Sequence, residues 1–556
     1  MAGTNTTRRL DILVVGTGFY QGFNPVVAAV TTLLVGALVL ALVAAPIASG
    51  NVLDILKHMT LTFFAGWYVY LLAIFVIFCL VLVMLPVAGR ITLGPDGAPP
   101  RHSTAAWLSM MFCSGIGIGV LVFSVSEPIS HFKTNPALLE GAVLPGSHDA
   151  AISAMRFVFL HWGLSAWACY AVTALALGLA CHRFGQPMAM RSAVAPLFGK
   201  RLEGMGGHIV DVLSLMAIIA GITTTIVLGL EQICSGLSVL TGNAFFADQF
   251  GNPPLAALLT MLVVSISCAI GSIISGPHRG VKWVSQLGIL IVFAVLLVFV
   301  IFGGGAELFN VFIQSSWRYV TTLPAQIATL YDPAGSLTSK AQSEWQNQWT
   351  VFYWAWWIAF SPFVGLFLAR ISYGRSVREF ILGAMLAPAA MCFVWFSATG
   401  GSVLLMELDG RAAGRILEAE HAFRIYAAVD VMLENASSFA YVVKAVLVFL
   451  FLVLIIASST AAIIAIKSIG AAGSDHGETP FHSMTWAVVI AAITGAVMAV
   501  GGVDSIRDVM IVGAVPFSFI MALMLVSVVL MIVEAARTTR RARPPLGQPS
   551  VAQELH

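Results

Sequence analysis

Long apolar stretches recur along this chain, and they constrain its fold more than any other feature. A helix needs roughly 20 apolar residues to cross the hydrocarbon core of a bilayer. Only 10% of the residues are charged and the mean hydropathy is +0.93, values far from those of soluble domains. We therefore predict an all-α integral membrane protein with about twelve spans, at residues 25–47, 61–86, 104–124, 151–180, 206–240, 254–274, 283–303, 347–370, 377–400, 438–466, 482–502 and 509–534.

The distribution of Lys and Arg predicts how the chain lies in the membrane. Most of the 28 basic residues fall on one side if both termini are cytoplasmic, so the positive-inside rule favours that orientation in a bacterial inner membrane. No cleavable signal precedes the first span, and the basic, Pro-rich tail is expected to be disordered near anionic membrane lipids. The net charge of +2 indicates no nucleic-acid binding, and the seven Cys include no CxxC pair that would indicate zinc.

Two polar connections, 305–346 and 405–437, interrupt the series of spans. The first contains FNVFIQSSWRYVTTL, which is either an amphipathic helix at the membrane interface or a surface connector. Two extra spans precede ten others, and five spans in each half force the halves into opposite orientations, as in an inverted repeat. This counting predicts a cytoplasmic segment, two N-terminal helices, a first repeat, a periplasmic loop, a second repeat and a cytoplasmic tail, at 1–24, 25–100, 101–304, 305–346, 347–535 and 536–556.

The third span carries three glycines in five positions, Gly115, Gly117 and Gly119. Each Gly costs about 0.5–1 kcal/mol against Ala in a helix, so the run favours local unwinding. Irregular backbone at membrane depth is tolerated where it lines a wet cavity, and transporters hold substrate and ions at such breaks. Close helix packing through small residues is the alternative. Glu127 and Pro128 are expected to end the span. The acid is either intramembrane and functional or, as we favour, at the outer interface, where it would cap the next short segment.

Aromatic residues gather on single faces of two spans. In the fourth span, Trp162, Trp167 and Tyr170 fall within an arc of about 140 degrees. In the eighth, Trp356, Trp357 and Phe360 share about 100 degrees with Tyr353, and Trp354 lies beside them. Aromatic faces attract a quaternary ammonium group, at about 0.5–2 kcal/mol per face. The pattern therefore indicates a cage for a methylated onium group, with an interfacial aromatic belt or simple packing as the alternatives.

Three strings, GIGIGVLVFSVSEP, HWGLSAWACYAV and FYWAWWIAFSPFVGLFLARISYGRSVREF, closely resemble the betaine/choline/carnitine transporter (BCCT) family, in register from about residue 104 to 535. The resemblance implies a LeuT-like fold of two inverted five-helix repeats after two N-terminal helices, usually assembled as a homotrimer. It also implies a carrier driven by sodium, by protons or by antiport.

The resemblance implies a substrate site whose walls come from the third, fourth and eighth spans: Gly115, Gly117, Gly119, Trp162, Trp167, Tyr170, Trp354, Trp356, Trp357 and Phe360. Phe360 stands where betaine carriers have Trp, so the position keeps a π face and loses an indole N–H. Gly119 stands where some choline carriers have Asp. Its lack of charge favours a zwitterion such as glycine betaine, whose carboxylate would meet backbone N–H groups of the third span.

Sodium is the coupling ion that the resemblance favours. Its implied ligands are carbonyls of Cys113 and Ile116, a carbonyl near Leu454, and the hydroxyl of Ser458, with Ser459 as a register alternative. A second site pairs Phe363 with threonines of the fifth span, which here are displaced from the family positions. Sodium-independent antiporters carry an Arg at the position of about Gly288, and its absence here favours sodium and leaves protons open.

Three classes of function remain at this stage. The favoured class is a secondary transporter that imports an onium compatible solute by alternating access, with glycine betaine, choline, carnitine and dimethylsulfoniopropionate all compatible with the cage. The second is a membrane sensor that binds the same solute without moving it. An enzyme is disfavoured because no span carries HExxH, a paired-Asp motif or a nucleophile with a base.

Overall fold

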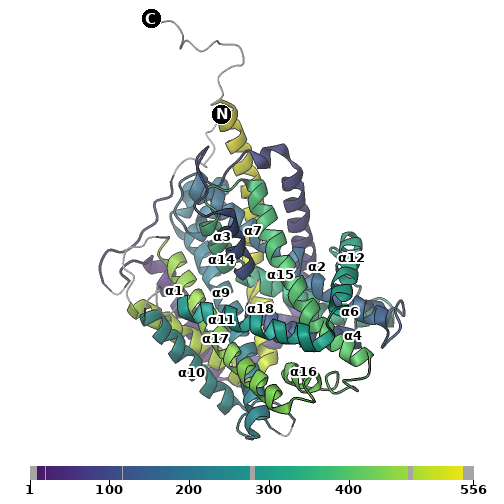
Figure 1. Ribbon diagram of the computed structural model, residues 1–556. Helices are drawn as coiled ribbons and strands as arrows, with labels where there is room; N and C mark the ends of the chain where they lie inside the picture. The colour runs from purple at the N-terminus through teal and green to yellow at the C-terminus, as the bar shows by residue number, and fades with distance from the viewer. Residues whose placement is uncertain are drawn as a thin grey trace, which may run out of the picture.

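The computed structural model describes residues 9–18, 20–114, 117–248, 250–275, 282–473 and 480–541, and these are almost entirely helical (Figure 1). Among these described residues, eleven helices are long and apolar enough to cross a membrane, and one bent pair brings the number of candidate spans to 12. Each of the predicted apolar stretches falls on one of them. The predicted all-α, multi-pass architecture is confirmed.

The first half of the chain contains these helices: α1 (Pro25–Ala44), α2 (Pro46–Met84), α3 (Thr104–Ser114), α4 (Ile118–Lys133), α5 (Pro136–Leu139), α6 (His148–Trp162), α7 (Leu164–Gly178), α8 (Ala195–Phe198), α9 (Met205–Thr241), α10 (Leu255–Ile274) and α11 (Lys282–Phe299). The second half contains α12 (Glu307–Gln326), α13 (Leu337–Gln346), α14 (Phe352–Ile371), α15 (Val377–Leu408), α16 (Arg424–Met432), α17 (Ser437–Gly470) and α18 (Pro480–Arg541). Short 3₁₀ and π segments extend several of them, including the π segment η7 (Asn347–Val351), which joins α13 to α14.

Glycines lie at the break in the third span and at the junction of the last two spans. The axis bends by 59° between Thr104–Cys113 and Ile118–Leu139, at the place where the glycine run predicts unwinding. Gly115 and Ile116 lie outside the described residues. The long helix α18 holds two spans, because Gly501 and Gly502 leave helical geometry and Gly502 has a φ of 62°, which favours glycine.

Some helices lie at the centre of the bundle and others at its edge. The apolar windows of His148–Arg183 and Met205–Thr241 are 89% buried, whereas those of Pro25–Ala44 and Trp283–Gly304 are 28% buried. Helix α14 packs against α7, α9 and α18, and α4 packs against α6 and α15. The central helices α4, α7, α9 and α14 therefore meet in the interior, while α1 and α11 leave most of their apolar surface facing outward.

The connection 305–346 contains the amphipathic helix that was predicted there. Helix α12 buries Leu308, Val311 and Tyr319, and it exposes Phe309 and Trp317. The helix is confirmed, and its place at the membrane interface stays a prediction. The connection 405–437 contains the short helix α16.

A buried ion pair ties the segment before α9 to α9 itself. The Arg191 Nε donates to Asp211 Oδ2 at 2.7 Å, and the backbone N–H of Arg191 donates to Asp211 Oδ1 at 3.0 Å. Both side chains are almost completely buried, at 0% and 2% exposure. Because a buried pair satisfies both charges, losing one partner leaves the other uncompensated.

We predict that Asp211→Ala destabilises the protein by about 3–5 kcal/mol, because it leaves the buried Arg191 guanidinium without its negative partner. Thermal unfolding of the detergent-purified protein measures the loss. The matched control is Asp409→Ala, which removes the acid of the half-exposed pair with Arg411. This control is expected to change stability by less than about 1 kcal/mol. Equal stability of the two variants would contradict the assigned role of the buried pair.

Candidate functional site

A cavity of about 530 Å³ lies where the broken third span meets the central helices. Its lining comes from α3, α4, α6, α7, α9, α11, α14 and α17, so it sits between the first and second predicted repeats. Among the described residues, those that line it include no Asp, Glu, Lys or Arg. The cavity is therefore an apolar and aromatic chamber with a few hydroxyl groups.

Most of the predicted cage residues line this cavity: Gly117, Gly119, Trp162, Trp167, Tyr170, Trp356, Trp357 and Phe360. The Trp356 and Trp357 rings are parallel, with an interplanar angle of 2° and centroids 5.5 Å apart. The Trp162 ring stands at 72° to Trp357, with centroids 5.0 Å apart. Rings from α6, α7 and α14 thus line one cavity. Their role in binding stays a prediction.

Gly119 allows the rings to approach α4. A Cβ at this position would lie 2.7 Å from Trp356 Cη2 and 3.1 Å from Trp162 Cη2. Gly221 likewise allows the Phe360 ring to approach α9, because a Cβ there would lie 2.7 Å from Phe360 Cδ2. An Asp at position 119 would therefore require the Trp356 ring to move.

Trp354 lies elsewhere. It is 1% exposed and lines a separate small pocket with residues such as Val69 and Gln346. Because consecutive helical residues are about 100 degrees apart, position 354 points about 200 degrees away from position 356. The structure therefore places Trp354 outside the aromatic cavity, in contrast to its predicted place beside the cage. Tyr353 is also absent from the lining, although it was predicted to share the face of Trp357.

The predicted sodium ligands divide into three groups. Cys113, Leu454, Ser458 and Phe363 line the cavity, as does Thr225 of the fifth span. Ser459 is buried, and its Oγ has no hydrogen-bond partner among the described residues. Ile116 lies outside the described residues. Hydroxyl and carbonyl oxygens are suitable donors for a hard cation, and sodium binding itself stays a prediction.

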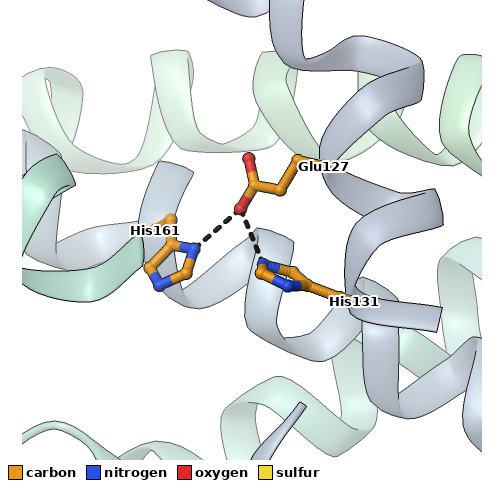
Figure 2. A group of neighbouring side chains, drawn as sticks. All are labelled: Glu127, His131 and His161. Atoms are coloured by element: carbon orange, nitrogen blue, oxygen red, sulfur yellow. Dashed lines mark hydrogen bonds and ion pairs between the residues drawn. The ribbon is translucent and has the colours of Figure 1, made fainter. Parts of the chain in front are cut away.

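Glu127 is placed differently from the sequence expectation. Helix α4 continues through Pro128 to Lys133, so the acid lies within the helix and is completely buried, rather than at the end of a span. Its Oε1 lies 3.2 Å from His131 Nε2 and 2.7 Å from His161 Nδ1 (Figure 2). The nitrogens of both imidazoles converge on this one carboxylate oxygen. That geometry is the one expected for hydrogen bonds.

The other oxygen of Glu127 contacts the aromatic residues. The Trp162 indole N–H donates to Oε2 at 2.8 Å, and the Tyr353 hydroxyl donates to the same atom at 2.5 Å. His161 Nε2 lies 3.0 Å from Thr350 Oγ1. A single carboxylate thus joins α4, α6 and α14, and His161 links it to η7. One of its partners, Trp162, lines the cavity.

The end of α6 positions two more indoles. Helix α6 ends at Trp162 because Gly163 leaves helical geometry, and the last carbonyls of a helix have no partner within it. The Trp357 N–H donates to the His161 carbonyl at 3.0 Å, and the Trp167 N–H donates to the Trp162 carbonyl at 3.1 Å. A Cβ at Gly163 would lie 2.4 Å from the Phe159 carbonyl, so only glycine fits this break. The helix end therefore determines the orientation of the cavity rings.

Sequence reasoning missed this polar network. An acid inside an apolar span was the available signal, since such residues are costly and commonly functional. The spacing of Glu127 and His131 also predicts that they share a helix face. His161 lies 34 residues further along the chain, so its contact with Glu127 requires the fold.

The fold and the cavity define a multi-pass membrane protein with an aromatic chamber at its centre. The chain matches the model of the BCCT family, described as betaine/carnitine/choline family transporter, over residues 26–537. It therefore belongs to this family, and it is a transporter rather than an enzyme. The LeuT-like fold implied by the resemblance follows from this membership, and α1, α2 and the ten later spans supply its helices.

Two relatives illustrate the similarity. A glycine betaine/proline/choline transporter of Vibrio parahaemolyticus is 34% identical, over 84% of this chain and 83% of the relative. A glycine betaine transporter of Acinetobacter baylyi is 31% identical, over 94% of this chain and 77% of the relative. Among solved structures, a manganese transporter of Eremococcus coleocola matches with a TM-score of 0.42 and 13% identity, over 81% of this chain and 89% of that one.

We predict that Glu127→Ala strongly destabilises the protein, because it leaves the Trp162 N–H, the Tyr353 hydroxyl and two imidazoles without their shared acceptor. Each unsatisfied buried group costs about 1–3 kcal/mol. The midpoint of thermal unfolding in detergent measures the effect. The control Glu307→Ala removes an exposed acid of α12 and is expected to leave the midpoint nearly unchanged. A Glu127→Ala protein as stable as this control would show that the network has no structural role.

Proposed function

We propose that this protein imports a methylated onium compatible solute, with glycine betaine favoured, by binding it in the aromatic cavity and exposing the cavity alternately to the two sides of the membrane. The observation that carries the proposal is the convergence of Trp162, Trp356 and Trp357 on one apolar chamber. The two relatives described above are named for glycine betaine, and one of them also for choline and proline.

The chemistry of the chamber suits a quaternary ammonium group. Such a group has no N–H, so an apolar chamber leaves none of its atoms without a hydrogen-bond partner. Each aromatic face contributes about 0.5–2 kcal/mol to holding its charge. The cavity volume of about 530 Å³ lies within the range of small-molecule sites.

A zwitterion is favoured over a simple cation by two features of the lining. No acidic side chain lines the described part of the cavity, so nothing there replaces a carboxylate of the substrate. Helix α4 also begins at Ile118 beside the cavity, and its N-cap, Gly117, provides no side-chain cap. The free N–H groups and positive dipole end of this helix would bind a carboxylate.

Sodium symport is the proposed source of energy. The oxygen donors supporting it are the backbone at Cys113 and Leu454 and the hydroxyl of Ser458, all at the cavity wall where the third and tenth spans meet. Gly288 also lines the cavity, so no Arg occupies the position used by sodium-independent antiporters. We further propose a homotrimer in a bacterial inner membrane with both termini in the cytoplasm.

We predict that Trp357→Leu lowers uptake of radiolabelled glycine betaine into proteoliposomes at least tenfold, because it removes a π face from the chamber. The matched control is Trp354→Leu, which changes another buried Trp of the same helix that lies outside the cavity. An inward sodium gradient is expected to drive accumulation by the wild type and by this control. Choline, carnitine, proline and dimethylsulfoniopropionate compete in parallel to rank the substrates.

Three results would contradict parts of this proposal. Binding of glycine betaine without accumulation would make the protein a sensor. Accumulation that follows a proton gradient and ignores sodium would make protons the coupling ion. Equal loss of uptake in Trp357→Leu and Trp354→Leu, with both proteins folded, would move the substrate out of the aromatic cavity.

We also predict that Gly119→Ala weakens glycine betaine binding about tenfold or more, because the new methyl group pushes the Trp356 and Trp162 rings into the chamber. The control is Gly117→Ala, two residues earlier, where a Cβ meets nothing within 4 Å. Isothermal titration calorimetry measures both affinities. The same affinity in the two variants would indicate that the rings do not form the binding surface.

A further inference from the structure

The network around Glu127 brings four side chains to one carboxylate, and their chemistry indicates the charge of that carboxylate. An indole N–H and a phenol hydroxyl donate to Oε2, and one ring nitrogen of each imidazole lies within hydrogen-bond distance of Oε1. An ionised carboxylate accepts at both oxygens, whereas a protonated one would have to donate from one of them. The arrangement therefore fits an ionised Glu127, fully buried in the protein.

A buried carboxylate needs a compensating positive charge, because an isolated ion in an apolar interior is very costly. Both imidazoles are able to provide it, since each already directs one nitrogen to Glu127. They differ at the other nitrogen. His161 Nε2 is engaged with Thr350, whereas His131 Nδ1 is buried and has no hydrogen-bond partner among the described residues. His131 Nδ1 is thus the position at which a proton is gained or lost without breaking a hydrogen bond.

Aromatic rings surround His131 and suit a cationic imidazole. Its ring centroid lies 4.7 Å from that of Trp349, 5.0 Å from that of Trp345 and 6.1 Å from that of Phe157. Such rings stabilise a nearby cation. The neutral ring also packs well among them, so both protonation states are compatible with the site.

The other charged groups near the network hold a constant charge. Arg424 on α16 donates to the Ser126 carbonyl at 3.0 Å and to Ser130 Oγ at 2.6 Å. The Arg507 guanidinium of α18 lies 4.4 Å from the centroid of the Phe352 ring. Desolvation and repulsion from these two guanidinium groups lower the pKa of His421, in the connection before α16, to about 3. His421 therefore stays neutral between about pH 5.5 and 8, the range in which histidines commonly titrate.

We propose that Glu127, His131 and His161 form a proton-binding site whose proton competes with the onium group in the aromatic cavity. This inference rests on the proposed function, because the competing cation is the substrate. With the proton bound, the network is neutral. Without it, the network carries one negative charge behind the Trp162 ring, and an onium group on the cavity side of that ring supplies the missing positive charge. The hydrogen bonds to Glu127 persist in both states, so the charge changes while the cage keeps its shape.

Choline is the best probe because it is a cation without a carboxylate of its own. We expect its Kd to fall as the pH rises from about 5.5 to 8, by up to about tenfold per pH unit, which is the limit for one competing proton. Binding should release a proton, which calorimetry detects as a difference in heat between phosphate and Tris buffers. Glu127→Gln should bind choline more weakly, with a Kd independent of pH and without proton release.

A second pair of variants tests whether the pH dependence of choline binding comes from this site or from any histidine of the protein. His131→Gln should lose the pH dependence, and the control His148→Gln, exposed at the start of the same α6 helix that carries His161, should keep it. A wild-type Kd that does not change with pH, or Glu127→Gln protein that still releases a proton, would overturn the proposal. Zinc binding that His131→Gln abolishes, without proton release, would make the cluster a metal site instead.

Nitrogen-15 NMR of the ligand-free protein distinguishes failure of this proposal from failure of the proposed function. We expect one imidazole to titrate in the wild type and its signal to be lost in His131→Gln. If that titration occurs and choline and glycine betaine bind at no pH, the proton site stands and the onium assignment fails. If the ligands bind and no buried histidine titrates, the proposed function stands and the proton site is rejected.

Discussion

The carboxylate of Glu127 is the interaction on which the rest of the site depends. It accepts hydrogen bonds from Trp162 and Tyr353 and lies within hydrogen-bond distance of His131 and His161, and so it joins α4 and α6 to α14, which is far away in the sequence. A buried charge is tolerated only when its partners are complete. The network therefore fixes the relative positions of α4, α6 and α14, and α6 and α14 supply aromatic surfaces of the cavity.

The aromatic chamber is built from gaps in regular helical structure. The break at Gly163 frees the carbonyls that orient the Trp167 and Trp357 indoles, and Gly119 gives their neighbours room against α4. The interruption of the third span places the N-terminus of α4 beside the chamber, and its N-cap, Gly117, makes no side-chain cap hydrogen bond among the described residues. Local departures from helix geometry thus place hydrogen-bond donors, acceptors and π faces around one volume.

Much of this arrangement is readable from the sequence, because it follows from short-range rules. Apolar length predicts each span, and the spacing of Trp356, Trp357 and Phe360 places them on one face of α14. The face predicted for Trp162, Trp167 and Tyr170 assumed one continuous helix, and the break at Gly163 puts Trp162 on α6 and the other two on α7. Such short-range rules do not predict the contacts of Glu127, since His161 and Tyr353 lie on other helices. Trp354 was predicted to lie beside the cage, and this was wrong. Its place in an aromatic-rich segment suggested the cage, but its side chain points away from those of Trp356 and Trp357. Family resemblance supplied the sodium ligands, which depend on oxygen positions that no pattern encodes.

The central claim is that an onium group occupies the chamber between the indoles. A cryo-EM structure determined in saturating glycine betaine tests it most directly. The account predicts density for a trimethylated head group between the rings of Trp162, Trp356 and Trp357, with the carboxylate of the ligand toward the start of α4. Density for the ligand at another site, with this chamber filled only by water, would contradict it.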